Sequence, residues 1–179
     1  MKQEGLQLNI VGEKVLLRAI ELTDKEVLLD IINDKETEHS LGGWSFPTSS
    51  LNQEEWIKAQ KQNTQILRCM INDKVDNKTI GTVILSDIDY KNGNAEIHIK
   101  LLSDVRGKGY GSDTVNTLVK YSFNELRLKC VYAHVNSYNE PSQKLFEKCG
   151  FIKEGILRSR IFKKGEYHNV VILSILNEG

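Results

Sequence analysis

The sequence predicts a mixed α/β (α+β) fold, with a largely antiparallel sheet, a parallel βαβ unit at its centre and flanking helices. Segments that alternate apolar and polar residues, as half-buried strands do, recur along the chain. A glycine-rich stretch and a helical pattern connect two later strands, and parallel strands need such a crossover. No linker, repeat or low-complexity run interrupts the 179 residues, so we expect one domain over residues 1–179.

The N-terminal third predicts one strand and two helices. Val11–Glu21 alternates and is rich in aliphatic residues, which indicates a strand. Thr23 and Glu26 have the spacing of a capping box, so a helix should follow. The loop Gly42–Pro47 ends that helix, and the Ser50–Gln53 pair repeats the cap signal before a second helix.

Three further strands are expected in the middle of the chain. Residues 65–73 and 78–89 form an antiparallel pair across a polar turn, and Ala95–Leu102 follows a second turn. Strict alternation in this last strand divides its side chains between two faces. One face carries Ile97, Ile99 and Leu101, and the other carries Glu96, His98 and Lys100.

The C-terminal part begins with the stretch "VRGKGYGSDT" at Val105, after which an apolar face with helical spacing predicts a helix. A strand is expected over Lys129–Asn136. Pro141 suits the first turn of a short helix, and Gly150 suits its left-handed C-terminal position. Residues 155–176 should close the fold as a hairpin.

Composition limits the function. Lys plus Arg equals Asp plus Glu at 24 each, so we expect neither nucleic acid nor an anionic membrane as a partner. No run of about 18 apolar residues is present, and no signal peptide is evident, so a cytoplasmic protein is expected. Its three cysteines have no CxxC spacing and indicate reduced thiols, with one reactive cysteine as the weaker alternative.

The glycine stretch suggests an anion site. It lacks the Ser or Thr of a Walker loop, because Lys108 is followed by Gly109, and Ser112 replaces the last glycine of the dinucleotide fingerprint. Glycines before a helix still allow backbone N–H groups to face an anion, and Arg106 adds positive charge. The alternative is a strand-to-helix turn that needs glycine for its backbone angles alone.

Two motifs together resemble the GNAT superfamily of acyl-CoA N-acyltransferases. Arg106–Gly111 is similar to its R/Q-x-x-G-x-G/A signature, and Asn139–Phe151, "NEPSQKLFEKCGF", is similar to its second hallmark segment. The resemblance extends over Val11–Leu176 and is strongest to the branch of ribosomal-protein N-terminal and spermidine acetyltransferases. It implies the family fold, acetyl-CoA as co-substrate, no metal, and a homodimer as in many relatives.

The resemblance also implies coenzyme contacts. The backbone of the strand before the glycine stretch would pair with the pantetheine arm, at Ile99, Lys100 and Leu101. The diphosphate would be lined by Arg106, Gly107, Lys108, Gly109, Tyr110, Gly111 and Ser112. Further contacts would come from Asn139 and Ser142.

Acetyl transfer to an amine needs a base for the amine and an acid for the departing thiolate. Glu96 is the first candidate base, and a substrate-orienting carboxylate is its equal alternative. His98 on the same face is the second candidate. Many relatives have a tyrosine acid where this chain has Phe146, which leaves Ser142, or failing that Tyr138. Ser142 could instead cap its helix.

The loop 42–47 falls where relatives bind the acceptor. Trp44 and Phe46 are expected to face the substrate or to anchor the loop, and Glu38, with Glu36 and Glu21, would attract an amine. The expected acceptor is a small primary amine such as a polyamine, amino sugar or amino acid. A protein N-terminus, a non-catalytic acyl-CoA-binding module and a nucleotide-phosphate binder are the alternatives.

Overall fold

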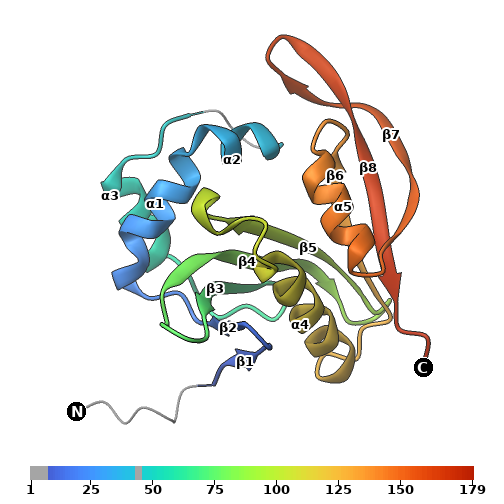
Figure 1. The fold of residues 1–179 in the computed structure, drawn as a ribbon, viewed down its shortest axis with the longest axis horizontal. Helices are drawn as coiled ribbons and strands as arrows, with labels where there is room; N and C mark the ends of the chain where they lie inside the picture. Colours follow the sequence, from blue (N-terminus) through green and yellow to red (C-terminus); the bar gives the residue numbers. More distant parts are fainter. Residues whose placement is uncertain (1–7, 43–45) are drawn as a thin grey trace.

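The computed structural model describes residues 8–42 and 46–179. Its strands form one eight-stranded sheet in the order β1-β2-β3-β4-β5-β6-β8-β7 (Figure 1). The strands are β1 (Ile10–Val11), β2 (Val15–Arg18), β3 (Leu67–Asp73), β4 (Thr79–Asp89), β5 (Asn94–Leu101), β6 (Cys130–Asn136), β7 (Ile152–Lys163) and β8 (Glu166–Leu176). Among these neighbours only β5 and β6 are parallel, so the predicted fold class is confirmed.

Five α-helices cover the two faces of the sheet. They are α1 (Lys25–Asn33), α2 (Lys35–Ser40), α3 (Ser50–Lys58), α4 (Tyr110–Asn124) and α5 (Glu140–Lys148), with short 3₁₀ turns at Leu22–Asp24 and Ser103–Val105. Figure 1 shows α2 in the upper part of the view, between α1 and the segment of β6 and α5. The described part of the chain has no helix with the length and apolarity to cross a membrane.

Adjacent residues of β3 assign the helices to opposite faces. Met70 is fully buried with Leu28 of α1 and Ile57 of α3. Ile71 points to the other face, because side chains alternate along a strand, and there it belongs to the main core with Val115 of α4. The sheet is therefore covered by α1 and α3 on one side and by α4 and α5 on the other.

The predicted strand Val11–Glu21 is wrong, because the chain turns within it. The Gly12 N–H donates to the Val15 carbonyl at 2.9 Å, which separates β1 from β2. A Cβ on Gly12 would lie 2.5 Å from Thr117 Oγ1, so this turn needs glycine to pack against α4. Alternation alone does not distinguish a tight hairpin from one continuous strand.

The predicted helix boundaries need correction at three places. The capping box joins Glu21 and Asp24 rather than Thr23 and Glu26. Asp34 interrupts the first helix, since it is extended and accepts the Thr37 N–H at 2.7 Å as the cap of α2. The cap of α3 is Ser49, one residue before the predicted position.

The predictions for the C-terminal elements hold better. Pro141 lies in the first turn of α5, and Gly150 has φ +89° after its end. The hairpin is present, but β7 starts at Ile152, three residues before the prediction. Figure 1 shows this hairpin along one edge of the molecule.

Candidate active site

The sheet opens between its two central strands. β5 and β6 pair at only three positions, the last of which joins Glu96 and Tyr132. Beyond this point β6 continues on β8 as far as Asn136, whereas β5 continues on β4 as far as Leu101. The backbone of β5 after Glu96 therefore has an edge toward β6 with no strand on it, which an extended ligand can pair with.

Four polar side chains meet where the two strands separate. Glu96 Oε1 lies 2.9 Å from His134 Nδ1 on β6 and 3.8 Å from His98 Nε2 on β5. His98 Nε2 lies 3.0 Å from the hydroxyl of Ser86 on β4. The Glu96 side chain is 13% exposed, so it is mostly buried but still accessible to a ligand.

Burial shapes the protonation of this cluster. Desolvation lowers the pKa of His98, although the negative charge of Glu96 opposes the shift. His98 is therefore neutral at pH 7 and can accept a proton. The pKa of Tyr132, beside Glu96 in the parallel register, is raised by its own burial, so its phenol stays protonated.

The N-terminus of α4 lies after this edge of β5 and has no side-chain cap. Gly109 is the N-cap residue with φ +88°, and Gly107 has φ +77°. Because the first helical N–H groups have no partner within their helix, they are available to an anion. A Cβ on Gly107 would meet nothing within 4 Å, so the loop faces open space.

Other residues of the stretch hold the loop in place. Arg106 Nη1 pairs with Glu36 of α2 at 2.6 Å, and its Nη2 donates to the Leu101 carbonyl at 3.3 Å. Lys108 accepts through its carbonyl from Lys14 Nζ at 3.1 Å, which brings a further cation to the loop. Lys14 therefore adds positive charge at the loop, whereas the charge of Arg106 is balanced by Glu36.

Three residues of the stretch, counted among the expected diphosphate contacts, pack or hydrogen-bond elsewhere. The Tyr110 hydroxyl donates to the Asp73 carboxylate. Gly111 is buried, and a Cβ there would lie 3.3 Å from the Leu145 methyl groups of α5. Ser112 offers its carbonyl to the Cys149 thiol at 3.8 Å.

The second motif forms the start of α5. Asn139 caps this helix, because its Oδ1 accepts the Ser142 N–H at 3.3 Å, so the alternative that Ser142 is the cap is wrong. Phe146 is 2% exposed and packs against Phe151 with ring centroids 5.0 Å apart. The Tyr138 hydroxyl donates to the His39 carbonyl of α2 at 2.7 Å.

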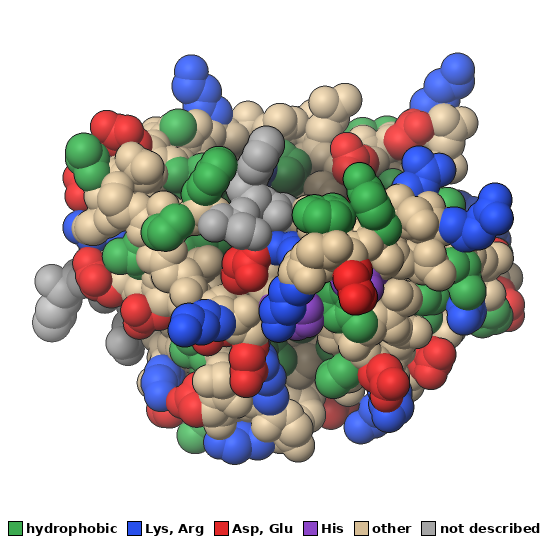
Figure 2. Space-filling model, turned by 90° about the horizontal axis from the view of Figure 1, so that it is seen from above, with side chains coloured by type: hydrophobic (Ala, Val, Ile, Leu, Met, Phe, Trp, Pro, Cys, Tyr) green, Lys and Arg blue, Asp and Glu red, His purple; other side chains and the backbone are tan. Residues whose placement is uncertain are grey.

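Helix α2 contacts the end of β6, because the Ser40 carbonyl accepts from Asn136 and the His39 carbonyl accepts from Tyr138. Its carboxylates are balanced by cations. Glu38 pairs with Lys163 of β7, so it does not offer an isolated charge to an amine. Phe46 is 75% exposed, and Trp44 lies outside the described residues. Figure 2 shows acidic and basic side chains interspersed on this face.

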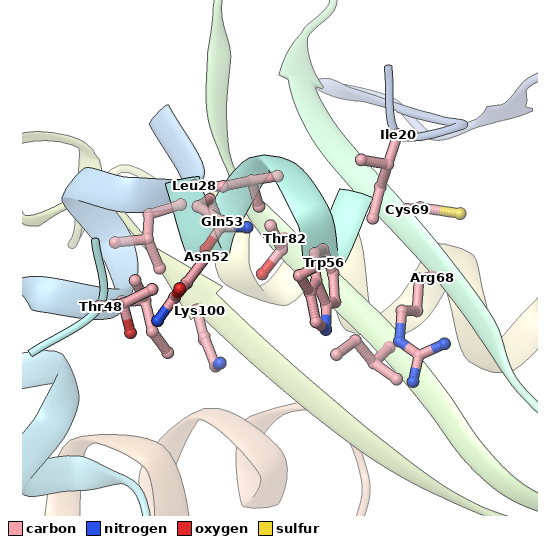
Figure 3. Close-up of a pocket in the computed structure, with 13 residues that line it drawn as sticks. Ile20, Leu28, Thr48, Asn52, Gln53, Trp56, Arg68, Cys69, Thr82 and Lys100 are labelled. Atoms are coloured by element: carbon pink, nitrogen blue, oxygen red, sulfur yellow. The ribbon is translucent and has the colours of Figure 1, made fainter. Parts of the chain in front are cut away.

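A cavity of about 440 Å³ lies between α1, α3 and the face of the sheet that carries His98 and Lys100. Its walls are mainly apolar, and Figure 3 shows Trp56 of α3 next to Arg68 of β3. The guanidinium carbon lies 5.9 Å from the centre of the Trp56 ring. Two cationic side chains, Arg68 and Lys100, thus reach a largely apolar space.

The cysteines offer no activated nucleophile. Cys69 is 5% exposed, and burial raises its pKa to about 11. Burial also raises the pKa values of Cys130 and Cys149, so all three are thiols at pH 7. The alternative of one reactive cysteine has no support in this geometry.

Three residues of the site, His134, Ser86 and Arg68, were not predicted from the sequence. Alternation in β6 places Tyr132 and His134 on one face, and the predicted parallel pair sets that face beside Glu96. His134 could have been found in this way. Arg68 could not, because its role depends on how α3 packs on the sheet.

The fold, with its sheet open between β5 and β6, is that of an acetyltransferase. A family model for the acetyltransferase (GNAT) domain matches residues 14–152, and the chain belongs to this family of N-acetyltransferases. The chain is 33% identical over 167 residues to the SPbeta prophage-derived uncharacterized N-acetyltransferase YokL of Bacillus subtilis, covering 93% of this chain and 92% of that protein.

Two further comparisons concern polyamine enzymes. The chain is 28% identical over 167 residues to spermidine N(1)-acetyltransferase of Vibrio cholerae, covering 93% of this chain and 95% of that protein. The crystal structure of a Vibrio cholerae spermidine N-acetyltransferase with CoA and spermine superposes with a TM-score of 0.84 at 29% identity. That match covers 91% of this chain and 95% of the other.

Proposed function

We propose that this enzyme transfers the acetyl group of acetyl-CoA to the primary amine of a small molecule, by direct attack in a ternary complex. The observation that carries the proposal is the position of Glu96, at the point where β5 and β6 separate. The unpaired edge of β5 begins there, and the uncapped N-terminus of α4 follows it in the chain. A proton acceptor therefore lies next to a strand edge that can bind a thioester.

Acetyl-CoA fits the residues present. The free N–H groups after Gly109, with Arg106, Lys108 and Lys14 near them, suit a diphosphate. The backbone from Ile99 to Leu101 suits the amides of a pantetheine arm. When bound, the coenzyme supplies the activated acetyl group, and the Vibrio cholerae neighbour, which has CoA in its structure, supports this assignment.

Glu96 takes the proton that an alkylammonium, with a pKa near 10.4, must lose before it can attack. His134 donates from Nδ1 to Glu96 and fixes the direction of the carboxylate. Neutral His98, 3.8 Å from Glu96, is placed to receive the proton next. Direct attack agrees with the protonated state of the cysteines.

Ser142 is the proposed proton donor to the departing thiolate. It is half-buried in the first turn of α5, and its hydroxyl is not used to cap that helix. Phe146 has no hydroxyl and lies in the core, so it takes no part in the chemistry. Tyr138 would first have to release the His39 carbonyl.

Release of free thiol, followed with a chromogenic reagent over a panel of primary amines, tests this function. We expect turnover with at least one amine and none in Gly109→Glu, where a carboxylate would enter the anion site. Gly165→Glu is the matched control, because Gly165 has φ +83° and lies in the β7–β8 turn. Normal acetyl-CoA binding by Gly109→Glu would overturn the assignment. Binding without turnover of any amine would instead indicate a non-catalytic module.

A further inference from the structure

The cavity between α1, α3 and the sheet is lined by positive but not by negative side chains among the described residues. Its described lining contains Arg68 and Lys100 but no aspartate or glutamate. Neither cation forms an ion pair within the described part of the chain, and Arg68 instead stacks near Trp56. Burial lowers the pKa of Lys100, which shows that its ammonium group is poorly solvated. An anion in the cavity would stabilise both cations.

Nearby carboxylates are already engaged. Glu54 of α3 pairs with Lys58 at 2.6 Å and with Lys25 at 3.3 Å. Asp24 pairs with Arg18 at 2.7 Å. These two acids therefore balance other cations rather than Arg68 or Lys100.

Strand register connects the cavity to the proposed base. Arg68 pairs with Ile84, and Ile84 pairs with His98, so Arg68 lies two strands from His98 in the same row. Two strand spacings amount to about 10 Å. Lys100 is two residues beyond His98 on the same face of β5, about 7 Å from it along the strand and at right angles to the direction of Arg68. One small molecule can therefore reach the Glu96 cluster with one end and the cations with the other.

We propose that the acceptor is an amino carboxylate, in which an apolar body separates the reacting amine from an anionic group bound by Arg68 and Lys100. This inference rests on the proposed function and names its substrate class. The apolar cavity wall, including Ile31 and Ile84, receives the body of the molecule. A polyamine would bring a second ammonium group to two unpaired cations, and this chain therefore selects against it.

Three acceptors with one six-carbon chain test the proposal: 6-aminohexanoate, hexylamine and 1,6-diaminohexane. They differ only in the charge at the far end. We expect kcat/KM from thiol release to favour 6-aminohexanoate over hexylamine on the order of ten- to a hundredfold, as for a hydrogen-bonded charge, with the diamine last. A kcat/KM for 1,6-diaminohexane that equals or exceeds that for 6-aminohexanoate overturns the proposal.

Variants locate the effect. Arg68→Met and Lys100→Met should each reduce the preference for 6-aminohexanoate over hexylamine about tenfold, whereas Lys58→Met, on the exposed end of α3, should leave that ratio unchanged. An unchanged ratio in both cavity variants, with normal thermal melts, overturns the proposal. If no amine releases thiol, the proposed function itself has failed. Calorimetry with hexanoate then still decides, because binding weakened by both variants supports the anion site and absent binding refutes it.

Discussion

Replacing Glu96 by glutamine removes the proposed proton acceptor and little else. Glutamine has nearly the same volume as glutamate, and its amide oxygen can still accept from His134 Nδ1, which lies 2.9 Å from the carboxylate in the native chain. The two side chains therefore differ mainly in their ability to take a proton. Any change in rate then reports on the base rather than on packing.

The size of the effect follows from the amine. General-base catalysis contributes about 10²–10⁴-fold, so we expect kcat/KM to fall by about 10³ near pH 7.4. With an amine pKa of 10.4, the free-base fraction is about 10⁻³ at pH 7.4 and about 10⁻¹ at pH 9.4. The variant should regain about 100-fold in rate over these two pH units, because the solvent then removes the proton.

The assay is thiol release at saturating acetyl-CoA across that pH range. Glu147→Gln, an exposed carboxylate on α5, is the control and should follow the native profile. Acetyl-CoA binding, measured separately by calorimetry, should be unaffected by Glu96→Gln. If the kcat/KM of Glu96→Gln is lower than the native value by the same factor at every pH, Glu96 is not the base. Its role would then be to orient the acceptor.

Two other predictions concern stability and thiol reactivity. Asp24 is 4% exposed and accepts from both Arg18 guanidinium nitrogens at 2.7 and 2.8 Å, so Asp24→Asn should cost about 3 kcal/mol and lower Tm by about 6–12 °C in calorimetry. A decrease in Tm of less than about 2 °C would contradict the predicted contribution of the Asp24–Arg18 pair to stability. Cys69, with its pKa raised to about 11, should be alkylated at pH 8 at least about 100-fold more slowly in the native than in the unfolded protein. Its raised pKa stabilises the fold below about pH 8.5, and this contribution is lost as the pH rises toward 11.

The sequence carried enough information for most of the sheet. Strands such as β5 alternate cleanly because one face is buried. Gly150 marks a helix end through its left-handed φ, and Pro141 marks a helix start because it has no N–H to donate. The errors lie where local signals compete. Two possible capping boxes overlap between Glu21 and Glu26. The observed box uses the carboxylate of Asp24, which is held in place by its buried ion pair with Arg18.

The site was easiest to predict where one strand carries it. Glu96 and His98 follow from alternation in β5, whereas His134 comes from a strand 38 residues away in sequence from Glu96. Arg106 shows the same limit, since its pairing with Glu36 spans 70 residues. The first pair depends on the parallel pairing of β5 and β6, and the second depends on the position of α2, which no local pattern encodes.

In this fold, the reaction shared with relatives and the choice of acceptor depend on different parts of the structure. The separation of β5 from β6 and the free N–H groups of α4 are backbone features, so relatives with 28% identity can share them. The charge of the cavity proposed to bind the acceptor comes from two single side chains, Arg68 of β3 and Lys100 of β5. A spermine complex in the Vibrio cholerae neighbour therefore supports the reaction proposed here more strongly than it supports a polyamine as the acceptor. Burial of the Lys100 ammonium group without an anionic partner is costly, and binding of the proposed anionic acceptor would offset that cost.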